Sequence, residues 1–273
     1  MRGFIMLSWC MLALLLPSLG AAGPVLILPQ DCQELYRSGV TSNGVYTIYP
    51  SPSTPVDVYC EISCTDDCDA VAGWTVIQRR MDGSVGFYRN WETYKNGFGN
   101  KSGEYWLGLD NLHLMTNNKL YELRIDLEDF DGLKSSAVYT TFIVGPESNS
   151  YTLQIGGFIN HGAGDSLSYH NGQKFSTYDN ENNNYGYYCG TNYFSGFWFN
   201  GCFYGNPNGL YLGRPYSYSP YYYYYYYYYY YPGIVWGSWR GWNYSLKGVT
   251  MKIRPFPHPP RVNSWQYSSP YYY

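Results

Sequence analysis

Residues 121–128 read Tyr121-Glu122-Leu123-Arg124-Ile125-Asp126-Leu127-Glu128, in which apolar and charged side chains alternate without a break. Successive side chains of a strand point to opposite faces, so this pattern predicts a strand with one buried and one solvated face. Residues 151–155 and 249–254 repeat the same period. Residues 45–49 and 75–80 also have the composition of strands.

Short helices are expected beside these strands. Asp31, with Glu34 three residues later, predicts the start of a brief helix that Gly39 would close. Residues 91–95 and 109–114 are further helical candidates. Strands joined by a few short helices, without a regular β-α-β alternation, predict an α+β fold with a central antiparallel sheet.

The first residues indicate the compartment. Arg2 precedes an apolar run over residues 4–16, and a cleavage region rich in small residues follows at 17–22, as in a secretory signal peptide. The run is shorter than the roughly 20 residues that span a bilayer, although an uncleaved signal anchor is the alternative. We expect residues 1–22 to be cleaved, residues 23–30 to form a short lead-in, and the protein to be secreted into the extracellular space or matrix, with no membrane span.

Cysteine usage agrees with secretion. Beyond the signal peptide the chain has an even set of cysteines: Cys32, Cys60, Cys64, Cys68, Cys189 and Cys202. In an oxidising compartment such a set predicts three disulfides, and fifteen connectivities remain possible. Cys64 and Cys68 are near enough in sequence to bridge each other. A zinc site is disfavoured because Cys189 and Cys202 have no neighbouring His or second cysteine pair.

The charge balance argues against nucleic acid as a partner. Lys and Arg number 17 against 20 Asp and Glu, for a net charge of -3, so the chain lacks the basic surface that phosphate backbones require.

Tyrosine is abundant, with 36 residues, and charged residues make up only 14%. The chain beyond Gly156 is rich in Gly, Asn and aromatic residues, which is typical of binding loops or disorder.

Two segments fit no ordinary core. Residues 221–231 are consecutive tyrosines, which we interpret as an insertion, because identical large rings cannot each find a complementary hole. Residues 256–273 form a Pro/Tyr-rich tail that we expect to be disordered. We therefore place one folded domain at residues 31–255.

A hydrolase motif is present but incomplete. Gly164-Asp165-Ser166-Leu167 spells the nucleophile block of a family of serine esterases. Those enzymes carry it after their first strand and need an Asp-x-x-His pair near the C-terminus to activate the serine. Here the block lies past mid-chain and no Asp follows Asp179, so His258 has no partner acid. We expect the protein not to be an enzyme.

Residues 179–184, Asp-Asn-Glu-Asn-Asn-Asn, are a candidate cation loop. Alternating oxygen-bearing side chains on an irregular loop can converge on a hard cation such as Ca²⁺. An EF-hand is excluded because its sixth position would be Asn184 and its twelfth Gly190. A solvated polar turn is the alternative interpretation.

Aromatic residues gather in sequence around Cys189 and Cys202. A disulfide between these cysteines would pin a short loop, and a pinned aromatic loop beside a cation suggests a pocket for a small, partly apolar ligand. Packing in the core is the alternative for most of the rings, Trp198 above all, leaving two or three to face a ligand. The set comprises Tyr193, Phe197, Trp198, Phe199, Phe203, Trp236, Trp239 and Trp242.

Several long blocks together resemble the fibrinogen-related domain, the C-terminal globe of fibrinogen, ficolins, tenascins and angiopoietins. The resemblance runs from about Asp31 to Pro255 and implies an α+β globe with a loop-rich calcium and ligand subdomain. Its blocks are Gly73–Arg80, Gly83–Trp91, Gly103–Leu109, Tyr121–Arg124, Gly162–His170 and Met251–Pro255.

The resemblance implies a disulfide pairing and a calcium site. The disulfides would be Cys32–Cys60 and Cys189–Cys202, with Cys64 and Cys68 as an additional pair. Calcium would be held before the second disulfide, and the family prefers Asp at positions 181 and 183, so one negative charge is lost here. The ligands would be the side chains of Glu181 and Asn183 and the carbonyls of Tyr185 and Tyr187, with Asp179 close by.

Lectin members of the family bind acetylated groups beside that calcium. By resemblance, the backbone amides of Cys202 and Phe203 would hold the acetyl oxygen. Tyr193, Trp242 and Tyr230 would form walls around the methyl group. The chain departs from the family pattern in having Phe203 in place of His and Tyr188-Cys189-Gly190 in place of Asn-Cys-Ala.

These observations predict a secreted, calcium-dependent recognition protein that binds acetylated carbohydrates or extracellular-matrix proteins. A structural matrix protein with a non-functional sugar pocket is the alternative. We expect a homo-oligomer and a glycan on Asn100, which starts the sequon Asn100-Lys101-Ser102.

Overall fold

The computed structural model of the protein describes residues 28–62, 73–183, 186–215 and 233–256. The helices are α1 (Cys32–Arg37), α2 (Trp91–Asn96), α3 (Leu109–Asn118), α4 (Cys189–Asn192) and α5 (Gly237–Arg240), with 3₁₀ turns η1 (Glu147–Asn149) and η2 (Ser168–His170). The longer strands are β1 (Gly44–Ser51), β2 (Thr54–Glu61), β3 (Trp74–Arg80), β6 (Tyr121–Glu128), β7 (Lys134–Val144), β8 (Leu153–His161) and β11 (Gly248–Pro255). The two-residue strands are β4 (Phe98–Gly99), β5 (Tyr105–Trp106), β9 (Gly205–Asn206) and β10 (Val235–Trp236).

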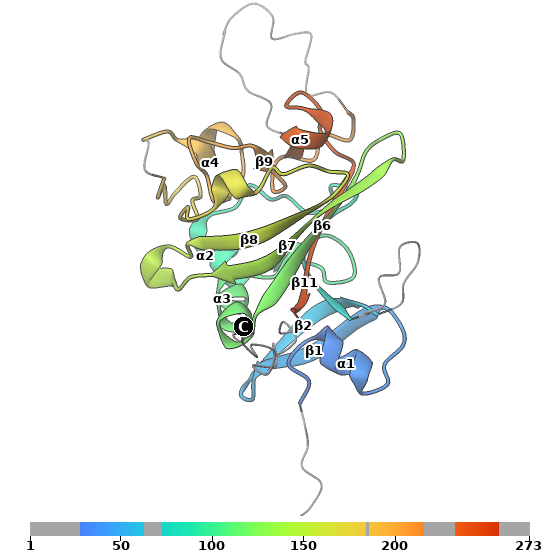
Figure 1. The fold of residues 1–273 in the computed structure, drawn as a ribbon. Helices are drawn as coiled ribbons and strands as arrows, with labels where there is room; N and C mark the ends of the chain where they lie inside the picture. Colours follow the sequence, from blue (N-terminus) through green and yellow to red (C-terminus); the bar gives the residue numbers. More distant parts are fainter. Residues whose placement is uncertain (1–27, 63–72, 184–185, 216–232, 257–273) are drawn as a thin grey trace, which may run out of the picture.

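The predicted α+β fold with an antiparallel sheet is confirmed. The main sheet has the order β1-β2-β3-β11-β6-β7-β8, with β5 and β4 attached beside β3, and these strands pair antiparallel. At one end of the molecule, α1 contacts β3 and β11, close to the edge of the sheet that carries β1 and β2 (Figure 1). At the other end, the loops that carry α4, β9 and α5 lie beyond β8 (Figure 1).

The strand β6, Tyr121–Glu128, has the predicted bounds. In β6, Leu123, Ile125 and Leu127 are buried, whereas Arg124 and Asp126 between them are half-buried. Its neighbours β11 and β7 cover both of its edges. The apolar side chains of β6 therefore face the core, as the alternation predicted.

One strand prediction is partly wrong. The segment 151–155 was expected to be extended, but β8 begins only at Leu153 and continues to His161. Ser150 and Tyr151 both have a φ of 49°, in the left-handed region, so the chain turns there before it enters the sheet. Two strands that were not predicted, β2 and β7, complete the sheet.

Helix starts follow the side-chain caps. The Oδ1 atom of Asp31 accepts a hydrogen bond from the Glu34 N–H at 3.0 Å, as the cap prediction requires. Asn90 caps α2 in the same way through the Thr93 N–H. The third helix, α3, is longer than the predicted 109–114 because its buried face extends to Met115 and Thr116.

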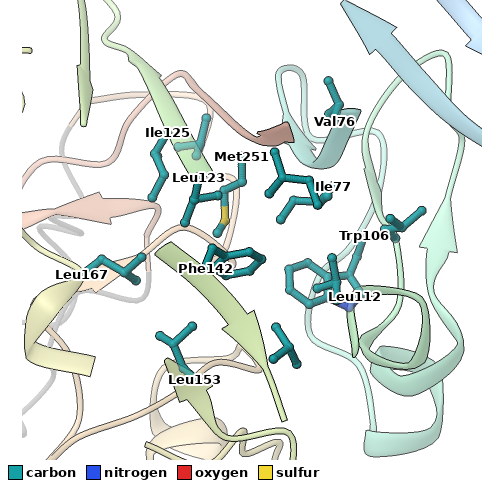
Figure 2. Close-up of a cluster of buried hydrophobic side chains, with 14 of the residues drawn as sticks. Val76, Ile77, Trp106, Leu112, Leu123, Ile125, Phe142, Leu153, Leu167 and Met251 are labelled. Atoms are coloured by element: carbon teal, nitrogen blue, oxygen red, sulfur yellow. The ribbon is translucent and has the colours of Figure 1, made fainter. Parts of the chain in front are cut away.

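The core lies between the sheet and α3. Figure 2 shows side chains from β3, β6, β7 and β11 meeting Leu112 of α3 and Trp106 of β5. Phe142 lies in the middle of this cluster and is fully buried. The indole N–H of Trp106 donates to the Tyr94 carbonyl at 2.9 Å, so the largest core ring buries no unpaired donor.

The first predicted disulfide is present. Cys32 and Cys60 are bonded with their Cα atoms 5.5 Å apart, which ties α1 to β2. Several predictions fall outside the described residues: the signal peptide, the pairing of Cys64 with Cys68, the tyrosine run and residues 257–273 of the tail. Within the described ranges, no helix is both long and apolar enough to cross a membrane.

Candidate functional site

The second predicted disulfide holds the loop-rich end together. Cys189 at the start of α4 is bonded to Cys202, with the Cα atoms 5.5 Å apart. Both cysteines are buried, and the bond joins the segment after the candidate cation loop to the aromatic segment 193–204. The candidate cation loop and the aromatic segment, which the sequence predicted separately, are therefore joined through this disulfide.

The oxygen atoms of the candidate cation loop converge. The Asn183 side-chain N–H group donates both to Glu181 Oε1 and to the Tyr187 carbonyl, so these two oxygens face one point. Glu181 Oε2 also accepts from the Gly190 N–H at 3.3 Å. Partial burial raises the pKa of the Glu181 carboxyl group, and its hydrogen bonds with Gly190 and Asn183 oppose that rise.

Asp179 has a different role from its neighbours. Its Oδ1 atom accepts from the Trp91 N–H at 2.9 Å and from the Thr177 hydroxyl at 2.7 Å. These bonds attach the loop to the first residue of α2. The carboxylate therefore anchors the loop, as well as supplying a negative charge beside it.

The residues present are chemically suited to calcium. A half-turn of the Asn183 amide would replace its N–H donor by Oδ1, so that three oxygens from Glu181, Asn183 and Tyr187 would face one point. Among the described residues there is no group of three or more His, Cys, Asp or Glu that could hold a metal ion. The donor set is thus mainly neutral oxygen, which suits a hard cation at modest affinity. Tyr185, the fourth predicted ligand, lies outside the described residues.

Two adjacent backbone donors are free beside the disulfide. In the described part of the chain, the N–H groups of Cys202 and Phe203 have no hydrogen-bond acceptor, whereas the Cys202 carbonyl accepts from Asn200 at 2.8 Å. Unpaired backbone N–H groups are uncommon in folded proteins unless a ligand or water satisfies them. The pair can therefore donate hydrogen bonds to one oxygen atom of a ligand.

Aromatic rings flank these donors. The Tyr193 and Phe203 rings meet edge to face with centroids 4.7 Å apart, and the Phe203 and Trp242 rings are 5.9 Å apart. Trp242 is 42% exposed. Tyr230, predicted as a further wall, lies outside the described residues. Two of the three predicted wall residues, Tyr193 and Trp242, therefore both contact the Phe203 ring, and their role in a ligand site stays a prediction.

The remaining rings belong to the core, as the alternative interpretation held. Four of them are fully or almost fully buried, and the Trp198 indole N–H donates to the Tyr151 carbonyl at 2.7 Å. Trp239 is partly buried. The four buried rings are Phe197, Trp198, Phe199 and Trp236.

His170 organises the site but gave no signal in the sequence. Its Nδ1 lies 2.7 Å from the Trp198 carbonyl, and its Nε2 accepts from the N–H groups of Tyr204 and Gly205 at 3.1 and 3.3 Å. This pattern requires a neutral ring with its proton on Nδ1. Complete burial lowers the pKa of His170 to about 4, so the ring stays neutral at physiological pH.

The Ser166 side chain is hydrogen-bonded to Ser238. Its hydroxyl is 2.8 Å from that of Ser238 and accepts from the Ser238 N–H at 2.9 Å. Ser166 is fully buried. In the described residues no histidine is hydrogen-bonded to it, and its hydroxyl group is engaged by Ser238.

Asn100 lies exposed in the turn between β4 and β5. Its side-chain Oδ1 accepts from the Ser102 N–H at 2.9 Å, which closes a local turn over the sequon. The position is accessible, and the glycan on it stays a prediction.

Comparisons with known proteins agree with this architecture. The C-terminal globular domain of the fibrinogen β and γ chains matches residues 28–256. Human microfibril-associated glycoprotein 4 is 46% identical over 232 residues, which cover 83% of this chain and 85% of that protein.

Solved structures give the same picture. The fibrinogen-like globe domain of human ANGPTL2 superposes with a TM-score of 0.76 at 40% identity, covering 84% of this chain and all of that one. Lamprey fibrin D-dimer, complexed with the peptide Gly-His-Arg-Pro-amide, gives a TM-score of 0.76 at 33% identity, covering 91% of this chain and 80% of that one.

Proposed function

The chain belongs to the family of the fibrinogen C-terminal globular domain, and from this membership we propose that it is a secreted, calcium-dependent recognition protein. Its ligands would be acetylated glycans, with extracellular-matrix proteins as further partners.

One observation carries the proposal. The free N–H groups of Cys202 and Phe203 point to the binding of a ligand oxygen, and the rings of Tyr193, Phe203 and Trp242 surround that position. An acetyl group offers the matching chemistry, since its carbonyl oxygen accepts hydrogen bonds and its methyl group packs against rings.

Calcium would supply rigidity to this end. Glu181, Asn183 and Tyr187 would hold the ion, and Cys189 follows Tyr187 by two residues in the disulfide loop. Fixing the oxygens would fix the loop that the disulfide attaches to Cys202. Removal of the ion would release that constraint, so chelation would weaken ligand binding.

The same contacts favour binding over catalysis. The Ser166 hydroxyl group is hydrogen-bonded to Ser238. Both ring nitrogens of His170 are hydrogen-bonded to backbone groups, Nδ1 to that of Trp198 and Nε2 to those of Tyr204 and Gly205. Neither group is placed to transfer a proton to a ligand. We therefore propose a non-enzymatic role in an oxidising, extracellular location, with assembly into homo-oligomers.

One observation favours the structural alternative. The Phe203 ring packs on Tyr193 at 4.7 Å and contacts Trp242, so it occupies space between the two walls. A filled pocket would leave matrix assembly as the main role, and a relative bears the name microfibril-associated glycoprotein 4.

Retention of the purified protein on a resin of N-acetylated sugar, first with calcium and then with chelator, tests the proposal. We expect retention in calcium and elution by chelator. Glu181→Gln removes the charge of the proposed calcium ligand and should raise the calcium needed for retention by about tenfold. Glu92→Gln, a similar change on the exposed side of α2, is the matched control and should leave it unchanged.

The result can also favour the alternative. Absence of retention by folded protein in calcium would reject glycan recognition. In that case Phe203→His, which reduces the filling of the pocket, would distinguish a site closed by its own side chain from a surface without affinity. Retention that chelator and Glu181→Gln leave unchanged would reject the role of calcium.

A further inference from the structure

The rings around the free N–H pair do not end at the pocket. Trp242 also packs on Tyr204 with centroids 4.7 Å apart, and Tyr204 packs on Tyr169 at 4.6 Å. Together these residues form a continuous series, Tyr193–Phe203–Trp242–Tyr204–Tyr169, which we call the ring row.

The outer half of the ring row is open to solvent. Trp242, Tyr204 and Tyr169 are 42%, 45% and 42% exposed, whereas Tyr193 and Phe203 are half-buried. Single exposed rings need no explanation, but contiguous exposed apolar surface is typical of interaction sites. An acetyl group would contact Tyr193, Phe203 and Trp242, so the rings of Tyr204 and Tyr169 form surface that the proposed function does not use.

The outer rings are fixed in position by buried contacts. His170 Nε2 accepts from the Tyr204 N–H, and the Tyr204 carbonyl accepts from the Gly237 N–H at 3.0 Å. The Tyr169 carbonyl accepts from the Asn200 side chain at 2.6 Å, and the Tyr169 ring packs at right angles on His170. The backbone under both rings is therefore ordered before any ligand arrives, which lowers the entropy lost on binding.

The chemistry of the outer rings suits a neutral, hydroxylated ligand. In the described residues, the hydroxyl groups of Tyr169 and Tyr204 have no hydrogen-bond partner, and the ring contacts join only uncharged side chains. A sugar ring presents C–H groups on its face and hydroxyls on its edge, which match an aromatic face and a free phenol hydroxyl.

We propose that Tyr204 and Tyr169 extend the site into a platform that binds the second and later sugars of an acetylated oligosaccharide. This inference depends on the proposed function, because the inner end of the platform is the acetyl pocket. It makes the preferred ligand a polymer of N-acetylated sugars, with the terminal acetyl group in the pocket and the following rings against Trp242, Tyr204 and Tyr169.

Calorimetric titration with soluble N-acetylglucosamine and with its β-1,4-linked tetramer, both in calcium, tests the platform. We expect the tetramer to bind at least tenfold more tightly than the monomer. Tyr204→Ala and Tyr169→Ala should each lower tetramer affinity about fivefold and leave monomer affinity unchanged, since one stacked ring contributes on that order.

Two further variants control for folding and for stacking. Tyr88→Ala removes an exposed ring that also packs on its neighbours, Tyr178 and Phe194, in a separate cluster, and it should change neither affinity. Tyr204→Phe keeps the ring and should retain most of the preference for the tetramer.

The outcomes distinguish the two proposals. Equal affinity for monomer and tetramer, or a tetramer preference that survives both alanine variants, would overturn the platform while leaving the acetyl pocket intact. No binding of either sugar by folded protein would overturn both. Loss of monomer affinity in Tyr204→Ala, with an unchanged melting temperature, would place Tyr204 in the acetyl pocket and also reject a separate platform.

Discussion

The two ends of the molecule are held together by different means. The sheet end, from α1 to β8, consists mainly of continuous antiparallel pairing around one apolar core. In the loop-rich end, from η2 to α5, the described residues form only the short strand pair β9–β10 and isolated bridges. There, side chains bond to backbone groups far away in sequence, as His170 does to Trp198 and Tyr204.

This difference shows what each end is suited to do. A repeating backbone ladder satisfies its own polar groups and leaves little free for a ligand. An irregular segment must be held by particular side chains, and it can leave individual donors unpaired, as at Cys202 and Phe203. Stability resides in the regular end, and specificity in the irregular one.

The largest expected effect is on the sheet end. Phe142→Ala removes a fully buried ring from the centre of the core and should lower the free energy of unfolding by about 4 kcal/mol. Because the core is continuous with the loop-rich end, both ends should lose stability together. Urea unfolding measures this, with the exposed Leu133→Ala as control; a loss below about 1.5 kcal/mol would contradict the comparison.

An intermediate effect is expected where the disulfide acts. The double variant Cys189→Ala/Cys202→Ala opens a loop of sequence separation 13 and should cost about 3 kcal/mol. Hydrogen exchange should report lost protection at residues 176–210 and unchanged protection in β6 and β7. Equal loss of protection in both ends would show that the loop-rich end is not an independent unit.

A smaller, pH-dependent effect is expected at His170. Burial lowers its folded pKa from 6.5 to about 4, so between these values the unfolded state binds more protons than the folded state. The contribution is fully present above pH 6.5 and is lost as pH falls toward 4. Wild type should lose about 2 kcal/mol more than His170→Gln between pH 7 and pH 4.5.

Unfolding curves of both proteins over that range measure the difference. The subtraction removes the contribution of the carboxylates, which both proteins share. Parallel pH profiles would show that folding does not lower the pKa of His170, against the role of its Nε2 as an acceptor for Tyr204 and Gly205.

The regular end was largely predictable from sequence. Alternation identified β6 with its full bounds and β11 within one residue at each end, and strand composition identified β3 within one residue. Alternation missed β7, in which Ala137, Val138 and Tyr139 are buried consecutively, so the period is broken. It started β8 too early, since nothing in the local pattern shows that Tyr151 is left-handed.

The site was predictable only where the family resemblance named residues. Both pairings of the described cysteines are confirmed on that basis, because the sequence alone left fifteen connectivities open. His170 and the outer ring Tyr169 were missed, since their partners lie about 30 residues away or more in sequence. The adjacency of Tyr204 to Phe203 was the one available signal for the ring row.

The position of β11 has a consequence for biosynthesis. Gly248–Pro255 is the last described strand along the chain, yet it lies between β3 and β6 and is the strand that joins the two halves of the sheet. A nascent chain that has not yet delivered this strand holds two half-sheets with open edges. The sheet must therefore close after nearly the whole domain has been synthesised, and until then both half-sheets expose unpaired strand edges.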